Sequence, residues 1–232
     1  MASGGVTGYA AISARVRAMY SDLLTPQDML RLNDSPDFPA LFSALKTTAY
    51  GPYLEGLKDK EITPKQVINQ VKKKLAASYY SVIQMAPENA RPLLKQLYRY
   101  YELGNLKAVL RALVTVPTWD TAETALWDRV RDVLFPMGTA SVLPAQAMIE
   151  SGSVATAVDL LQGTPYEEAL SFAMRRYSAE QNLFPLEIAL DLSYWRRLWA
   201  EAKRLTGKDR EQSTKIIGSF LDMNNLMWAI RY

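Results

Sequence analysis

Apolar residues recur along this chain at helical spacing, and nowhere do apolar and polar residues alternate for long enough to predict a β-strand. Thr63-Pro64 has the form of a helix start, a capping threonine followed by proline in the first turn. The apolar positions that follow at steps of about four residues are Val67, Val71, Leu75, Tyr79 and Val82. They predict one face of a long helix that ends before Pro87.

A second long helix is predicted from about Glu88 to Leu113, with Pro117 beyond its end. In the second half of the chain, Gly207 is well suited to the position that follows a helix end. The helix before it carries an apolar seam at Leu186, Leu190, Tyr194 and Leu198. Because apolar stripes of this kind must be buried against neighbouring helices, the sequence predicts an all-α fold.

Two of the predicted helix endings are near copies of each other, 120 positions apart. Both read as an acid, two variable residues, Asn-Leu, two variable residues, a small apolar residue, an aliphatic residue and arginine. This signature consists of Glu102, Asn105, Leu106 and Arg111 in the first copy, and of Asp222, Asn225, Leu226 and Arg231 in the second. Internal repetition indicates that one structural unit is used twice.

Three further matches support a duplication and keep the same order in both halves. They pair Arg15-Val16-Arg17 with Arg129-Val130-Arg131, then Leu24, Gln27, Met29 and Leu30 with Leu143, Gln146, Met148 and Ile149, and then residues 45–50 with residues 161–166. We therefore predict two divergent helical repeats, 1–118 and 119–232, joined near residues 116–119. Each repeat should consist of several short helices followed by a long antiparallel helix pair.

The signature has a functional and a structural interpretation. Its acid and its asparagine lie about one helical turn apart, so the pair could make a polar contact with a partner. Alternatively, Asn105 and Asn225 could hydrogen-bond neighbouring helix ends and fix the packing register, where an unpaired polar group would be costly. Repetition favours the structural interpretation, since a unique ligand site would not need duplicating. We expect both asparagines to be buried at equivalent places.

The composition excludes several kinds of chemistry. The 232 residues include no cysteine and no histidine, which excludes disulfides, thiolate nucleophiles and a Ser-His-Asp triad. Histidine is the commonest general base and the commonest transition-metal ligand, so sites that depend on it are excluded as well. Glu167 and Glu168 are adjacent in sequence and diverge around a helix, and the residues around Gly207-Lys208 lack the spacing of a phosphate-binding loop. We expect no catalytic, cofactor-binding or metal site, and no enzymatic activity.

The formal net charge of +3 is unevenly divided. Residues 1–118 hold 15 Lys/Arg against 9 Asp/Glu, whereas residues 119–232 hold 12 against 15. This imbalance is too mild for a nucleic-acid-binding protein. For Lys72-Lys73-Lys74 and for the arginine pairs at 175–176 and 196–197, a solvated helix face is favoured over a binding patch.

No apolar run is long enough to span a bilayer, and residues 1–8 do not resemble a signal peptide. The cluster Tyr98, Tyr100 and Tyr101 cannot face one core, so at least one ring should be exposed.

These motifs resemble the C subunit of the archaeal and bacterial V/A-type rotary ATPases, which is called the d subunit in eukaryotes. The segment from Tyr9 to Arg17 is similar to the start of that family, as are Leu23-Leu24 and Thr48-Ala49-Tyr50. The strongest similarity is the recurrent ending at Glu102–Arg111 and Asp222–Arg231. The resemblance covers essentially the whole chain.

The resemblance implies an all-helical, funnel-like, pseudo-threefold architecture and a non-catalytic component of the central stalk. Such a component is a socket that couples the rotor shaft to the membrane proteolipid ring during proton or sodium transport. The implied partners are the shaft subunits and the membrane ring, without nucleic acid and without a direct membrane span. The implied location is cytoplasmic, peripheral to the membrane. The alternative is a generic helical-repeat scaffold that binds another protein.

The family implied by the resemblance has three repeats, whereas this sequence contains two. The face of the second repeat that a third would cover should then be exposed, including Trp228, Ile230 and Tyr232. Exposed apolar patches tend to find partners, so this face could mediate self-association. The alternative is that the terminal helix folds back against its own repeat.

Overall fold

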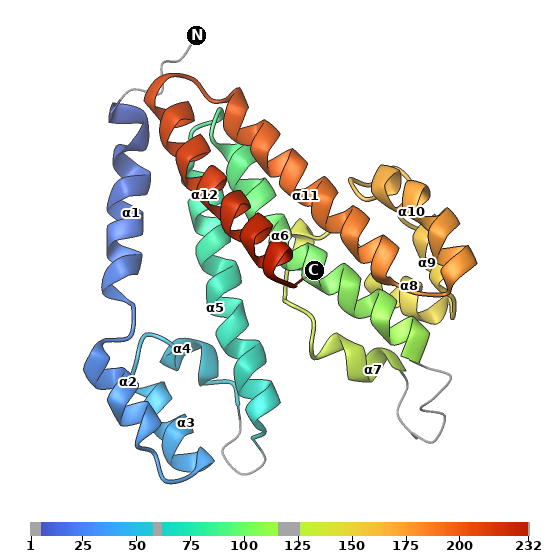
Figure 1. Cartoon of the computed structure of the whole chain (residues 1–232). Coiled ribbons are helices and arrows are strands. Elements are labelled where there is room, and N and C mark those ends of the chain that lie inside the picture. Colours follow the sequence, from blue (N-terminus) through green and yellow to red (C-terminus); the bar gives the residue numbers. More distant parts are fainter. Residues whose placement is uncertain (1–5, 58–61, 116–125, 232) are drawn as a thin grey trace. The chain divides into compact units, whose positions relative to one another are not determined.

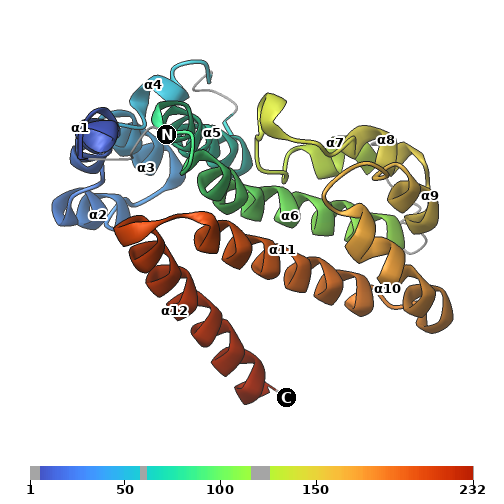
Figure 2. The ribbon, with the colours of Figure 1, turned by 90° about the horizontal axis from the view of Figure 1, so that it is seen from above.

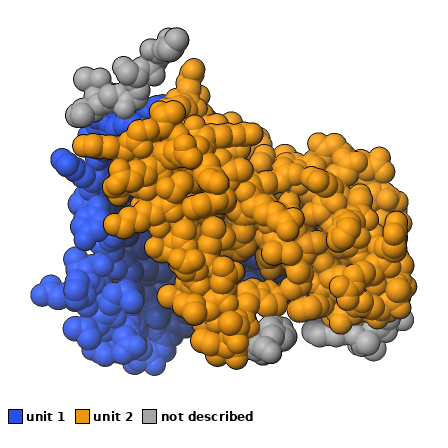
Figure 3. Space-filling model, turned by 45° about the horizontal axis from the view of Figure 1, so that its top comes forward, with its two compact units in different colours: residues 1–87, 132–138 blue, residues 88–131, 139–232 orange. Residues whose placement is uncertain are grey.

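The computed structural model describes residues 6–57, 62–115 and 126–231 (Figure 1). The regular structure in these ranges is entirely helical, which confirms the predicted all-α fold. The chain forms two compact units, coloured separately in Figure 3. Unit 1 comprises residues 1–87 and 132–138, and unit 2 comprises residues 88–131 and 139–232. None of the described helices is both long enough and apolar enough to cross a membrane.

The described residues of unit 1 form the short 3₁₀ helix η1 (Val6–Tyr9) and five α-helices. These are α1 (Ala10–Ser21), α2 (Pro26–Asn33), α3 (Phe38–Lys46), α4 (Gly51–Leu54) and α5 (Pro64–Met85). Its core consists of the buried side chains of Phe42, Leu45, Leu54 and Val67, surrounded by partly buried apolar residues. Gly51 at the start of α4 is required by close approach, because a Cβ atom there would lie 2.3 Å from the carbonyl oxygen of Lys46.

Unit 2 contains three long helices, α6 (Arg91–Thr115), α11 (Phe184–Arg204) and α12 (Gly207–Arg231). Shorter elements lie between α6 and α11 in the sequence: α7 (Leu126–Arg131), η3 (Gly138–Ala140), α8 (Ala145–Glu150), α9 (Val154–Asp159) and α10 (Glu167–Glu180). Helices α6 and α11 run side by side in both views (Figures 1 and 2). Figure 2 shows that α12 moves away from α11 toward its carboxyl end.

Threonine and proline define the predicted helix starts. Thr63 forms a capping box with Gln66, and α5 begins at Pro64 as predicted. Helix α6 begins at Arg91, three residues after the predicted start, and continues to Thr115. The predicted seam of α11 is confirmed, since Leu186, Leu190, Tyr194 and Leu198 are all buried. Gly207 has φ +55° and stands one position later than predicted, two residues after the C-cap Leu205.

The two-repeat division, 1–118 and 119–232, remains a prediction, because its joint at residues 116–119 lies outside the described residues. The predicted pair of long helices in the second copy is present, since α11 and α12 contact each other. The corresponding helices of the first copy, α5 and α6, belong to different compact units, so their pairing also remains a prediction.

Candidate functional site: the paired helix endings

The first signature is built around a fully buried carboxylate, that of Glu102 on α6. Its Oε1 accepts hydrogen bonds from the backbone N–H of Val142 (2.5 Å) and the hydroxyl of Ser141 (2.9 Å). Its Oε2 accepts a hydrogen bond from the hydroxyl of Tyr166 at 2.7 Å. These three donors satisfy a charge that would otherwise be very costly to bury. They lie 39 to 64 residues further along the chain, so Glu102 joins α6 to the short-helix segment of the second half.

Tyr166 is held firmly in its neutral form. Its burial, together with the neighbouring Glu102 carboxylate, raises the pKa of its hydroxyl well above the ordinary value. The cause is physical: a phenolate here would lose water and would lie beside a second negative charge. The hydroxyl therefore acts as a hydrogen-bond donor to Glu102 throughout the neutral range.

Two ion pairs continue the contact from α6 to α11. Arg111, the last residue of the signature, binds Glu187 in bidentate fashion, with Nε–Oε1 2.6 Å and Nη2–Oε2 2.8 Å. Hydrogen bonding to Glu187 raises the pKa of the Arg111 guanidinium, so it stays charged. One turn earlier, Lys107 Nζ lies 2.6 Å from Asp191 Oδ1. The pairing of 107 with 191 and 111 with 187 shows that the two helices are antiparallel.

The remaining residues of the first signature are in the interior. Asn105 is 8% exposed and Leu106 is fully buried. The prediction that Asn105 is buried is therefore confirmed. In the first copy, the signature residues Glu102, Asn105 and Leu106 together form one packed surface of α6, which we call the signature face.

The second signature is different, and the prediction that Asn225 is buried is wrong. Asp222 and Asn225 are exposed, and Leu226 is 59% exposed. The side chain of Arg231 lies outside the described part of the chain. The physical reason is that α12 packs against α11 through residues such as the buried Ile217, and the second signature lies outside that contact. Trp228 and Ile230 are exposed as predicted, at 41% and 78%, whereas Tyr232 lies outside the described residues.

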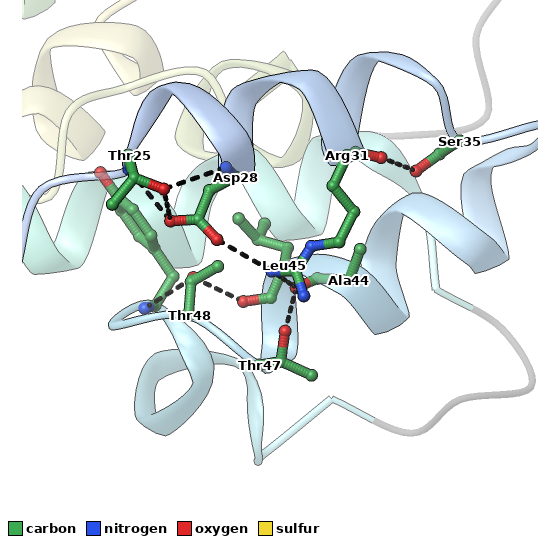
Figure 4. A network of polar contacts seen from close by, with 9 residues as sticks. Thr25, Asp28, Arg31, Ser35, Ala44, Leu45, Thr47 and Thr48 are labelled. Carbon is green, nitrogen blue, oxygen red and sulfur yellow. Dashed lines mark hydrogen bonds and ion pairs between the residues drawn. The ribbon is translucent and has the colours of Figure 1, made fainter.

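The match between residues 45–50 and 161–166 corresponds to one local structure that occurs twice. The hydroxyl of Thr48 donates to the carbonyl of Leu45 at 2.7 Å and accepts from the N–H of Tyr50 at 3.2 Å (Figure 4). The hydroxyl of Thr164 likewise donates to the carbonyl of Leu161 and accepts from the N–H of Tyr166. In both cases the tyrosine precedes a helix, with φ and ψ of −88° and −15° at Tyr50 and −97° and −17° at Tyr166. This agreement in detail supports the duplication.

In another pair of matched segments, the earlier segment is exposed and the later one is buried, which is the reverse of the signature. Met29 and Leu30 on α2 are 56% and 62% exposed, whereas their counterparts Met148 and Ile149 on α8 are 0% and 5% exposed. Helix α8 contacts α6, the helix that carries the first signature. Met148 and Ile149 are therefore buried on a helix that packs against α6.

The other sequence candidates are mostly surface features. Among the tyrosines, Tyr98 is buried and Tyr100 is 56% exposed, so the prediction that one ring faces outward is confirmed. In the lysine run, Lys72 donates to the carbonyl of Val133, and the ammonium of Lys74 lies 5.2 Å from the centre of the Tyr50 ring. Arg176 pairs with Glu180 on its own helix. Within the described ranges, no three acidic or other metal-ligating side chains come together.

The sequence does not indicate what the signature binds. It singles out Tyr166 only as part of a repeated turn, and Ser141 not at all. The sequence does contain a clue to Tyr166. A buried acid requires hydrogen-bond donors, and the repeated turn places a tyrosine at a defined position before a helix.

Comparison with known proteins identifies the family. A sequence model described as ATP synthase (C/AC39) subunit matches residues 12–232. The chain belongs to the ATP synthase (C/AC39) subunit family. The predicted resemblance is thereby confirmed.

Three relatives show how distant the relationship is, and each is the C subunit of an A-type ATP synthase. The protein of Methanocaldococcus jannaschii is 25% identical over 219 residues, which cover 94% of this chain and 52% of that protein. Those of Methanosphaera stadtmanae and Pyrococcus horikoshii are each 26% identical, over 96% and 97% of this chain and 54% and 56% of the relatives. The chain thus spans about half the length of these relatives.

Proposed function

We propose that this chain acts as a non-catalytic central-stalk component of a rotary V/A-type ATPase, coupling the rotor shaft to the membrane ring in proton or sodium transport. Its membership in the ATP synthase (C/AC39) subunit family is the observation that carries this proposal. The chain would work at the cytoplasmic face of the membrane, held there by other subunits.

The packing of unit 2 suits a part that transmits force. A coupling element must keep its shape under load, so its helices need lateral connections that resist sliding. In unit 2, α6 is connected to α11 by two ion pairs and to the segment before α10 by the buried Glu102.

Binding to isolated subunits tests the coupling role. The purified chain would be immobilised and exposed to the shaft subunits and, separately, to the detergent-solubilised ring of the A-type enzyme from the same source. We expect saturable binding to at least one of them and none to an unrelated coiled coil of similar charge. A correctly folded chain that binds neither component would contradict the proposal.

We further propose that α12 self-associates with α12 of a second copy. Five exposed apolar residues recur there at steps of three or four, so they form one stripe: Ile216, Phe220, Met223, Met227 and Ile230. The positions 120 residues earlier lie on the face of α6 that contacts α11, where Lys107 pairs with Asp191 and the Tyr100 ring lies 5.7 Å from that of Tyr194. The stripe is therefore a helix-packing face, and an antiparallel copy of itself would match it by twofold symmetry.

Sedimentation at increasing concentration tests this contact. We expect dimers that dissociate when Met223 and Ile230 are both replaced by aspartate. Phe172→Asp is the matched control, because Phe172 is 84% exposed on α10, away from the stripe. A monomer at all concentrations, or equal effects of the control and the double variant, would contradict the contact.

A further inference from the structure

A cleft of about 400 Å³ lies beside the amino-terminal end of α6, within unit 2. Its lining residues are Glu88, Arg91, Pro92, Lys95, Gln96 and Arg99, with Glu201 contributed by α11. Arg91, Lys95 and Arg99 are spaced by four residues, so their side chains share one face of the helix. Three cations therefore line one wall of the cleft.

Two carboxylates, those of Glu88 and Glu201, also belong to the lining. Glu201 already has a cation of its own, since its Oε1 lies 2.7 Å from Nη1 of Arg204. Glu88 is exposed and precedes the first turn of α6. The amino end of a long helix adds further positive potential from its backbone N–H groups. Repulsion among cations spaced by four residues is unfavourable to the helix, and a bound anion would relieve it.

The predicted repeat separates this row of cations from the signature. The signature recurs 120 positions later with its acid, asparagine and arginine intact, whereas the positions that match Arg91, Lys95 and Arg99 hold Glu211, Lys215 and Ser219. The signature residues are thus common to the two copies, and the complete cationic row occurs in the first copy alone.

We propose that this cleft binds a phosphate group, supplied either as a free phosphate compound or as a phospholipid headgroup. The Arg99 guanidinium offers donors that match phosphate oxygens, and Lys95 adds a mobile charge. The buried amide of Gln96 forms part of the lining, with its Oε1 held by Nη1 of Arg99 at 3.4 Å. Among the described residues, none of those that line the cleft is aromatic, so the lining favours a compact phosphate over a nucleotide whose base would need a stacking surface.

Calorimetric titration of the full chain with inorganic pyrophosphate, in phosphate-free buffer at low salt, tests the free-ligand source. We expect Lys95→Glu to weaken binding about tenfold or more, because it removes a charge-assisted contact and adds repulsion. Lys215→Glu is the matched control: it makes the same charge change at the equivalent, exposed position of α12 and should leave binding within about twofold. Glu88→Gln should strengthen binding, since it removes a negative charge from the cleft.

Co-sedimentation with vesicles tests the lipid source. Vesicles of phosphatidylcholine alone are compared with vesicles that also contain phosphatidic acid, using the same three variants. Pyrophosphate binding with the expected order of variants supports a free phosphate ligand, and the same order seen only with phosphatidic acid supports a headgroup. Absence of binding in both experiments, or equal loss in Lys95→Glu and Lys215→Glu, would overturn the proposal.

Discussion

Replacing Glu102 by leucine tests the central claim about the signature, that its acid is a buried connection between segments distant in sequence. The substitution places an apolar side chain of similar size in the interior and removes both carboxylate acceptors. The hydroxyl of Tyr166, a residue that is only 8% exposed, then loses its carboxylate acceptor. The hydroxyl of Ser141 and the backbone N–H of Val142 also lose their acceptor. These two residues lie closer to solvent, so water can replace some of the lost hydrogen bonds.

The expected cost follows from these three contacts. An unsatisfied buried donor costs about 1–3 kcal/mol, and bonds to a charged acceptor are stronger than neutral ones. Counting Tyr166 in full and the two loop donors in part gives about 3–5 kcal/mol for Glu102→Leu. Glu102→Gln should cost less, about 1–2 kcal/mol, because the amide oxygen can still accept from Val142 while the Tyr166 hydroxyl turns to accept from the amide N–H.

Equilibrium unfolding in urea measures these free energies, with the slope of the transition checked for constancy. Asp222→Leu is the matched control, since it makes the corresponding change at the equivalent position in α12, where the side chain is exposed. Its effect should stay within about 0.5 kcal/mol. If Glu102→Leu and Asp222→Leu changed the free energy of unfolding by the same small amount, the carboxylate network would not stabilise the fold as argued.

Three further outcomes are expected. Asn105→Leu should lower the free energy of unfolding by about 1–3 kcal/mol, whereas Asn225→Leu should leave it nearly unchanged in the same urea titration; similar losses would show that burial does not distinguish the two. Arg111→Ala should cost no more than about 1 kcal/mol, since the Arg111 side chain is 61% exposed, and the loss should shrink at high salt; a loss insensitive to salt would point to packing. Because the raised pKa of Tyr166 favours its protonated form in the folded state, its contribution is complete below the unfolded pKa of about 10 and falls above it, by up to about 1.4 kcal/mol per pH unit. Stability measured against pH should therefore decline more steeply in the wild type than in Tyr166→Phe, and parallel curves would refute this.

Local signals in the sequence are sufficient to predict the long helices. Thr63 and Pro64 define the start of α5 because capping and proline act within one turn. The predicted seam from Leu186 to Leu198 is correct because a helix buried on one side must carry an apolar residue about every four positions. The predicted start of α6 is less accurate: residues 88–90 precede the helix although their composition does not exclude it.

Contacts between distant segments cannot be predicted in the same way. Nothing near Glu102 in the sequence indicates that its donors are Ser141, Val142 and Tyr166, because that contact depends on how the short helices pack against α6. The error at Asn225 has the same origin. Its sequence context matches that of Asn105, yet burial is decided by the element that covers the helix, and a single helix does not encode its neighbour.

The opposite burial of matched residues indicates what the signature specifies. In a stack of similar units, each unit packs only against the next, and the two outermost faces stay exposed. On the predicted two-repeat division, the contact between the repeats joins Glu102 to Tyr166, and Met148 and Ile149 are also buried. The equivalents at the two ends are exposed: Met29 and Leu30 at the start, and Asp222 and Asn225 at the end. The signature is therefore a packing face, whose burial reports whether another helical unit lies against it. Helix α12 carries an exposed copy of that face together with the apolar stripe, and both features suit a helix that packs against a partner.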